Sequence, residues 1–584
     1  AAPAVQRPAE EAPRARPFRV GRAPALAHTE LTPEQLDFAR DLARRYSERF
    51  PGSKAHTDAH RPVHADPRSA AGYREEWKEL VFPVVAAGAK GAYIEDVDGN
   101  RFIDLVNGFG QTAFGHSPGF VTEAVSAQME KGFPIGPQAD LAGPVADRFA
   151  RMTGQERVTF CNTGSEAVMA AMRLARAVTG REKIVVFAND YHGQFDEVLV
   201  KARSRGGAPD ALPIAPGIPR SGLANMAVLG YGDPASLDWI RGNINDIAGV
   251  IVEPVQSRHP NHRPAEFVRE LRRITEEGGA ALVMDEVVTG FRTGPRGMQG
   301  IWGIEGDMAT YGKVVGGGMP VGVLAGRRRF MDALDGGAWR FGDDSTPETA
   351  PTFFAGTFVR HPLVLAAVDA VLDHLETEGG ALWTDAAERS AALADEMRGM
   401  LAARGLPDLI EDYSSWHVVK TTERDSRATL LFPLMRMQGV HVLDGFAGFL
   451  TTAHGAAECR AVTDAFGAAL DELQAAGLLA GETDAVAAPP EKAEAPSGNI
   501  PLTEGQREIW MAHQMGDEAA ASFNESVSIT LEGALDRRAL EQALADLVAR
   551  HDALRLRFAR SGETFHVAPA DASELPFADL SAEA

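Results

Sequence analysis

Short apolar runs alternate with amphipathic stretches through the middle of the chain. Three of the runs are "KIVVFAN", "IAGVIVEPV" and "AALVMDEVV", which begin at Lys183, Ile247 and Ala280. Stretches such as "PAEFVRELRRITEEGG", from Pro264 to Gly279, separate the runs and carry apolar residues at helical spacing. Apolar runs without polar alternation are typical of strands that are buried on both faces. The pattern therefore predicts an α/β fold with a mainly parallel sheet and crossover helices.

Two carboxylates follow these runs, where the strands should end. Glu253 follows "IAGVIV", and Asp285 follows "ALVM". In open sheets of this type, ligands collect at the carboxyl ends of the strands. A carboxylate at the end of a buried strand is costly unless it meets a cation or a strong donor. Asp285 therefore either caps the following turn or needs a partner in a ligand site.

Two further stretches combine a strand end with polar groups. In "CNTGSEAVMAAMRLARAVTG", Gly164 and Ser165 would present N–H groups and a hydroxyl at a helix start. That arrangement suits an anion such as phosphate, although an ordinary capped helix explains it too. In "FANDYHGQFDE", Tyr191 and His192 place an aromatic ring and an imidazole at the mouth of a strand. Packing in a core is the commoner use of such a tyrosine.

A single lysine, Lys313, precedes a run of glycines in "YGKVVGGGMPVG". The glycines predict either a flexible turn or room for a ligand beside the lysine. A phosphate site, a stacking ring, a buried carboxylate and a lysine 28 positions after Asp285 together match the needs of pyridoxal phosphate. Its ring nitrogen needs a carboxylate and its aldehyde needs an amine. We expect burial to favour the neutral, nucleophilic form of the lysine.

Composition and charge narrow the classes of partner. The chain has 584 residues, 45% hydrophobic and 24% charged, with a formal net charge of −23. The negative charge repels phosphate backbones, so we expect no nucleic acid partner, and no apolar run approaches the roughly 20 residues that span a bilayer. Cys161 and Cys459 cannot form a disulfide framework, and no Cys/His spacing resembles a metal site. We therefore expect a cytoplasmic protein without membrane contact, excised from a longer chain that begins before this Ala.

Two segments rich in Ala, Pro and charge predict linkers, at residues 1–30 and 479–499. After the first, Thr32 and Pro33 in "LTPEQLDFARDLARRY" predict a capped helix within an N-terminal helical segment, residues 31–74. The body then runs over residues 75–478, and a tail of residues 500–584 opens with a similar pattern in "PLTEGQREIW".

From about Glu75 to Leu473 the chain resembles class III aminotransferases of the fold type I pyridoxal phosphate superfamily, close to the glutamate semialdehyde aminomutases. The matching stretches, in family order, are "IEDVDGNRFIDL", "NTGSEAVMAAMRLARAVTGREKI", "YHG", "VIVEPV", "DEVVTGFR", "YGKVVGGGMPVG" and "GTFVRHPL". The resemblance implies a large pyridoxal phosphate domain at about residues 130–370. It also implies a smaller α+β domain built from residues 75–129 and 371–478.

The same resemblance implies roles for individual residues. Lys313 would bond covalently to pyridoxal 5'-phosphate and shuttle protons, and Asp285 would bind the pyridine nitrogen. The other implied cofactor-binding residues are Gly164 and Ser165 at the phosphate, Tyr191 and Val287 on the two ring faces, and His192 and Glu253 within the matching motifs. Thr357, in "GTF", would reach the phosphate of a neighbouring subunit, which implies a homodimer.

The tail indicates a substrate. "PLTEGQREIWMAHQM" and "LVARHDALRLRF" resemble the first two motifs of nonribosomal peptide synthetase condensation domains, whereas the catalytic "HHxxxDG" is absent. The tail is thus interpreted as the N-terminal fragment of such a domain. This order resembles the aminotransferases of hybrid polyketide and peptide synthetases of the iturin and mycosubtilin type, which serve antibiotic biosynthesis. This resemblance implies that an amino group is transferred from an amino acid donor to a β-ketoacyl thioester on an acyl carrier protein.

Two alternatives remain open at this stage. One is an aminomutase or ω-aminotransferase that acts on free small molecules, although "EPVQSRHP" departs from the stretch usual in aminomutases. The other is a non-catalytic docking module, which the intact Lys313 and Asp285 disfavour. If a carrier protein docks, we expect Arg327–Arg329 and Arg258 to border the opening of the site, with binding of the donor carboxylate as the other interpretation of Arg258.

Overall fold

The computed structural model describes two compact units, the first ending at Thr483 and the second beginning at Asp484. The described residues of the first unit are 31–70, 75–202, 211–420 and 426–479. In the second they are 500–502, 506, 510, 536–559 and 564–569. Linker 1–30, nearly all of linker 479–499 and most of the motif "PLTEGQREIWMAHQM" lie outside the described residues.

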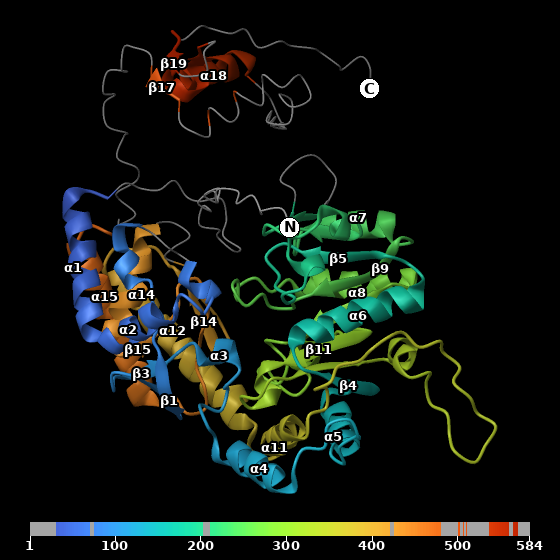
Figure 1. Cartoon of the computed structure of the whole chain (residues 1–584). Coiled ribbons are helices and arrows are strands. Elements are labelled where there is room, and N and C mark those ends of the chain that lie inside the picture. The colour runs from blue at the N-terminus through green and yellow to red at the C-terminus, as the bar shows by residue number, and fades with distance from the viewer. Residues whose placement is uncertain are drawn as a thin grey trace, which may run out of the picture. The chain divides into compact units, whose positions relative to one another are not determined.

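Seven strands form the central sheet of the first unit, in the order β4-β12-β11-β10-β9-β5-β8 (Figure 1). β12 pairs antiparallel with β4 and β11, and the strands from β11 to β8 are parallel to their neighbours. The bounds are β4 Arg157–Cys161, β5 Lys183–Phe187, β8 Met226–Leu229, β9 Ile247–Val252, β10 Ala281–Asp285, β11 Met308–Gly312 and β12 Gly322–Gly326. The α/β fold with a mainly parallel sheet is confirmed.

Helices bury both faces of this sheet. Along β5, Ile184 and Val186 belong to the core of α6 (Gly164–Thr179), on one face. Val185 and Phe187 belong to the core that contains α5 (Ala142–Thr153), α8 (Ala265–Gly278) and α11 (Pro362–Glu378). Since successive side chains point to opposite faces and both faces are covered, apolar residues fill most positions along β5, β9 and β10. This explains the continuous apolar runs in the sequence.

Local capping sets where the helices begin. The Thr163 hydroxyl accepts a hydrogen bond from the Glu166 N–H at the start of α6. At the start of α1 (Pro33–Arg49), Thr32 and Gln35 form a reciprocal capping box. Each helix therefore begins at the residue that the sequence predicts.

A separate core joins the two ends of the body. It contains buried side chains from residues 39–105 and from residues 393–478. These segments form two sheets, β1-β2-β3-β15 and β13-β14-β16, with α1, α12, α14 and α15 around them (Figure 1). The bounds are β1 Ala86–Lys90, β2 Tyr93–Asp96, β3 Arg101–Asp104, α12 Ala386–Ala403, β13 Ile410–Tyr413, β14 Trp416–Val419, α14 Leu431–Met437, β15 Val440–His441, β16 Gly448–Phe449 and α15 Ala456–Ala475. α1 thus belongs to this core.

The remaining elements connect these layers or belong to the second unit. The first unit also contains α2 Pro51–His60, η2 Glu75–Leu80, α3 Asn107–Gly110, α4 Gly119–Lys131, β6 Val200–Ala202, β7 Ala211–Pro213, α7 Pro234–Asn243, α9 Gly297–Trp302, η5 Lys313–Gly316, α10 Arg328–Met331 and the π-helical η7 Ala381–Asp385. The second unit contains β17 Ile500–Pro501, α18 Arg537–Arg550, β18 Leu556–Phe558 and β19 Thr564–Val567, with the sheet order β17-β19-β18. Within the described residues, no helix has the length and apolar character needed to cross a membrane.

Replacing Gly317 with alanine should destabilise the first unit. Gly317 has φ +56°, and a Cβ there would lie 2.8 Å from a Val371 methyl of α11 and 2.9 Å from a Val121 methyl of α4. Backbone strain and overpacking together should cost about 2–4 kcal/mol in urea unfolding. Gly242→Ala, in α7, is the matched control, because a Cβ there meets open space. Equal unfolding midpoints for the two variants would contradict this packing.

Candidate functional site

The residues that the sequence singled out meet at one edge of the central sheet. Asp285 is the last residue of β10, and Lys313 and Glu253 directly follow β11 and β9. Since these three strands are parallel and adjacent, their carboxyl ends lie at the same edge. The loop after β5 brings Tyr191 and His192 to this edge as well.

Asp285 is buried, with its carboxylate held from three directions. His192 Nδ1 lies 2.7 Å from Oδ2, the Thr310 hydroxyl donates to Oδ1 at 3.0 Å and the Val287 N–H donates to Oδ1 at 3.2 Å. His192 is itself buried, and its Nε2 lies 3.2 Å from an oxygen of Asp190. Burial opposes the imidazolium, but Asp190 and Asp285 outweigh it and raise the pKa of His192 to about 10. Asp285 is therefore paired with a cation, as its position at the end of a buried strand requires.

Glu253 occupies a second buried carboxylate position. The N–H groups of Tyr191 and Ser257 donate to its oxygens at 3.3 and 3.0 Å. Burial, and then the charges of Asp190 and Asp285, raise the pKa of Glu253 to about 8. Glu253 therefore takes up a proton more readily than an ordinary glutamate does, which reduces the negative charge of the site.

Lys313 begins the turn η5 in a left-handed conformation, with φ +45°. The side chain is half-buried. Burial lowers the pKa of its ammonium, against the opposing effect of Glu253 and Asp285, and so favours the neutral amine. The neutral form that the sequence analysis required therefore has a physical cause.

Packing requires two of the three glycines that follow Val315 in the lysine turn. A Cβ at Gly316 would lie 3.0 Å from a Val321 methyl, and one at Gly317 would press on Val371 and Val121. Of the three, only Gly318 faces open space. Gly317 is therefore required by the close approach of α4 and α11, whereas Gly318 leaves the open space that the sequence analysis allowed for a ligand.

Three further contacts assemble a cradle at the N-terminus of α6. A Cβ at Gly164 would lie 3.1 Å from a Val287 methyl, and one at Gly193 would lie 2.5 Å from the Ser165 hydroxyl oxygen. The N–H of Gln194 donates to that hydroxyl at 3.2 Å. The first N–H groups of a helix have no partner within it, so this cradle suits an anion. The Tyr191 ring is 59% exposed and thus available to a ligand.

Thr357 stands apart from this cluster. It is exposed on the segment between α10 and α11. Within the described parts of the chain, no hydrogen bond or ion pair joins Thr357 to the other candidate residues. The structure of one chain therefore does not bring Thr357 to the site.

Sequence reasoning missed one fully buried cation. Arg292, in "DEVVTGFR", donates to the carbonyls of Val288 and Gly110 and to the Ser415 hydroxyl. Burial lowers its pKa to about 9, and its charge disfavours the ammonium of Lys313. The motif "DEVVTGFR" contains this arginine and could have drawn attention to it. The residues around it do not indicate, however, that its side chain is buried. Asp190 was missed too, although it precedes Tyr191 directly.

The expectation that Arg327–Arg329 border the opening of the site is wrong. β12 runs antiparallel, and its last residue, Gly326, pairs with Met308 at the start of β11 and with Arg157 at the start of β4. Arg327–Arg329 therefore lie at the edge of the sheet opposite to Asp285 and Lys313. Only Arg258 of the expected cations lies beside the site, where its charge acts on Tyr191.

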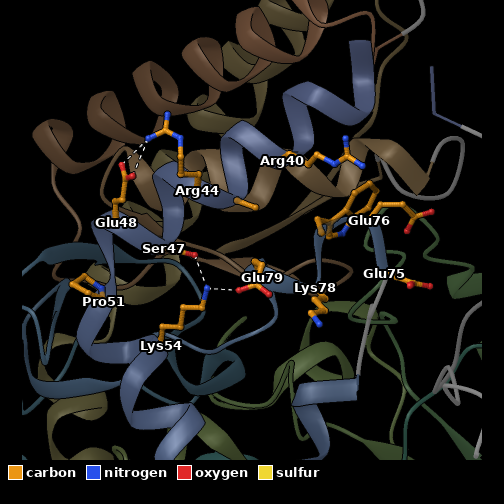
Figure 2. Close-up of a pocket in the computed structure, with 12 residues that line it drawn as sticks. Arg40, Arg44, Ser47, Glu48, Pro51, Lys54, Glu75, Glu76, Lys78 and Glu79 are labelled. Atoms are coloured by element: carbon orange, nitrogen blue, oxygen red, sulfur yellow. Dashed lines mark hydrogen bonds and ion pairs between the residues drawn. The ribbon is translucent and has the colours of Figure 1, made fainter. Parts of the chain in front are cut away.

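A groove of about 810 Å³ lies elsewhere, between α1 and η2 (Figure 2). Its lining includes none of the candidate residues. Figure 2 shows Lys54 between Ser47 and Glu79, and Arg44 beside Glu48. Because these charges are paired with one another, the groove offers no evident site for a ligand.

Comparisons with known proteins match this arrangement. Residues 74–469 match the Aminotransferase class-III family, and residues 497–583 match the Condensation domain family. Glutamate-1-semialdehyde 2,1-aminomutase of Pyrobaculum aerophilum is 36% identical over 393 residues, covering 65% of this chain and 90% of its own. A solved transaminase with PLP bound aligns with TM-score 0.65 and 27% identity, over 73% of this chain and 99% of its own. A β-phenylalanine aminotransferase from Variovorax paradoxus aligns with TM-score 0.63 and 26% identity, over 76% and 98%.

The pairing of His192 predicts a pH dependence of stability. Its pKa of about 10 lies above the ordinary value of 6.5, so this stabilisation is complete below about pH 6.5 and is lost as the pH rises toward 10. His192→Asn should therefore lower the urea midpoint of the cofactor-free protein most at pH 6.5. The corresponding deficit in the free energy of unfolding should shrink by a few kcal/mol by pH 10. A deficit that is constant across this range would contradict a charged His192.

Proposed function

The chain belongs to the class III aminotransferases, and on that premise we propose that it aminates a β-ketoacyl thioester on an acyl carrier protein. It is a pyridoxal phosphate-dependent enzyme of the fold type I class, as the sequence analysis predicted. The proposed product is a β-aminoacyl thioester, and the proposed amino donor is an amino acid. The single observation that carries the choice of substrate is the condensation domain match directly after the aminotransferase in the same chain.

The residues at the sheet edge fit this cofactor. The cradle of Gly164 and Ser165 at the start of α6 suits its phosphate, and Tyr191 and Val287 suit its ring faces. Asp285 suits the pyridine nitrogen, with Lys313 at the end of the neighbouring strand. When bound, the cofactor supplies a carbonyl that exchanges amines and a ring that withdraws electrons.

The chain's own groups supply proton transfer and charge. His192 holds the Asp285 carboxylate in place, so that this carboxylate can hold a proton on a ring nitrogen. The lowered pKa of Lys313 leaves its Nζ free to accept a proton from a substrate carbon and return it. Transamination needs this shuttle in both half-reactions.

The second candidate function acts on free substrates. The curated relatives are glutamate-1-semialdehyde 2,1-aminomutases, which favours a free small-molecule aminomutase or ω-aminotransferase reaction. A condensation domain, by contrast, acylates amines that are held on carrier proteins, so its presence favours the tethered substrate. A non-catalytic docking role is disfavoured, because every group needed for the chemistry is present at the sheet edge.

A homodimer is part of the proposal. Thr357 lies on the segment between α10 and α11, which exposes Phe341 (92%), Phe353 (78%) and Phe358 (59%). Exposed aromatic residues concentrated on one segment are typical of an interface. A second copy that covers this segment would bring Thr357 to its neighbour's phosphate site.

The proposed substrate is tested with purified protein and one β-ketoacyl group in two forms. We expect kcat/KM with the carrier-bound thioester to exceed that with the matching free β-keto acid by about tenfold or more, since the carrier adds binding energy. Lys313→Ala should abolish turnover of both, because no other amine replaces the shuttle. A preference for free keto acids would instead support the second candidate, and activity in the lysine variant would refute the site.

Asp285→Asn should reduce kcat by about two orders of magnitude, because the amide keeps the shape but cannot hold the ring proton by charge. Asp190→Asn is the matched control, since Asp190 also contacts His192 but is not placed on the ring. Stopped-flow absorbance of the donor half-reaction provides the measurement. A smaller loss in Asp285→Asn than in Asp190→Asn would remove Asp285 from its role.

A further inference from the structure

Arg258 is a half-buried cation beside the site, and among the residues that the structure describes it has no acidic partner. It follows Ser257, whose N–H donates to Glu253, and its charge acts on the Tyr191 phenol. Among the described residues, no carboxylate lies within 4 Å of its guanidinium. Other half-buried or exposed arginines of the described residues do have such a partner, as Arg241 does with Glu270. A half-buried guanidinium without a nearby carboxylate is suited to an anionic ligand.

The guanidinium rests on an aromatic pair. It lies 5.6 Å from the centroid of the Phe446 ring, which in turn lies 5.1 Å from the centroid of Phe109. The Phe446 side chain is 41% exposed. The pair therefore presents an open apolar surface directly beside the charge.

The fold holds the turn that carries Phe109 against the turn that begins with Lys313. Phe109 has φ +61° within α3, a turn in which Asn107 also has positive φ. The Asn107 amide donates to the Phe449 carbonyl at 2.8 Å, and Arg292 donates to the Gly110 carbonyl. α3 packs against η5, the turn that begins with Lys313. A strained turn held by buried donors is a rigid wall for a ligand.

We propose that Arg258 binds the carboxylate of the amino donor, while Phe109 and Phe446 cover the apolar part of the ligand at Lys313. This rests on the proposed transamination and specifies its donor as a carboxylate-bearing amine. The planar guanidinium offers two parallel N–H donors, which match the two oxygens of a carboxylate. A phosphate on the carrier's flexible arm presents similar oxygens, so the test separates the two sources.

The donor half-reaction is followed alone, by cofactor absorbance in single turnovers without any carrier protein. The probes are the best donor from a panel of L-α-amino acids and the amine that lacks its α-carboxylate. Arg258→Gln should raise the apparent Kd of the amino acid by about 10- to 100-fold and change that of the amine less than about twofold. Arg258→Lys should fall between, because it keeps the charge but loses the paired donors.

A binding measurement and a matched variant complete the test. Calorimetry with the donor's α-methyl analogue, which has no α-proton to lose, should give the same rise in Kd without turnover. Arg68→Gln is the control, because Arg68 lies 5.4 Å from the Phe109 ring at the exposed end of the same pair. It should leave donor binding unchanged.

Three results would overturn the proposal. Equal losses for the amino acid and the amine would make Arg258 structural, and equal losses in Arg258→Gln and Arg68→Gln would indicate a general charge effect. A loss confined to the carrier-bound acceptor would assign Arg258 to the phosphate of the arm. Because the donor half-reaction needs no carrier protein, failure here is distinguishable from failure of the proposed acceptor.

Discussion

The pairing of Asp285 with His192 is the interaction on which the geometry of the site depends. A carboxylate at the end of a central strand is buried by the fold itself, and an unpaired charge there would be strongly destabilising. His192 comes from the loop after β5, and Thr310 comes from β11. The contacts of the Asp285 carboxylate therefore connect loops and strands that lie far apart in sequence. The aromatic ring of Tyr191 takes its position as a neighbour of that imidazole.

The charges around Lys313 oppose one another. The carboxylates of Asp285 and Glu253 favour the ammonium, whereas burial and the guanidinium of Arg292 favour the amine. The raised pKa of Glu253 removes much of the negative charge at neutral pH. A lysine that must act as both nucleophile and proton carrier needs this balance, because either extreme would leave it permanently protonated or too weak a base.

The central sheet and the core built from both chain ends contribute to one site. Arg292 reaches from the segment after β10 to Gly110 and to Ser415, which belong to the small sheets and their connections. Asp104, at the end of β3, lies between His116 and His441 and accepts hydrogen bonds from the N–H groups of the turn that precedes Gly110. Buried polar contacts between the two cores therefore fix α3, which carries Phe109 and contacts η5, the turn that begins with Lys313.

The sequence by itself determined the elements and the chemical groups of the site. Apolar runs buried on both faces predicted β5, β9 and β10, and a Thr-Gly-Ser start predicted α6, because period and capping are local properties. The lysine and the strand-end carboxylate could be named because a buried charge demands a partner. The family motifs then supplied roles for Tyr191 and Val287.

Only the tertiary structure decided how the charges are distributed around those groups. Because β12 is antiparallel to its neighbours, Arg327–Arg329 lie at the edge of the sheet opposite to Lys313. An apolar run in the sequence does not indicate the direction of the strand. Burial made Arg292 a donor to backbone carbonyls, and the fold placed Arg258 beside Phe446 with no carboxylate of the described residues within ion-pair distance. Gly317 has to be a glycine because α4 and α11, which are distant in sequence, approach it closely. Each of these depends on contacts between remote segments, which local patterns of residues do not encode.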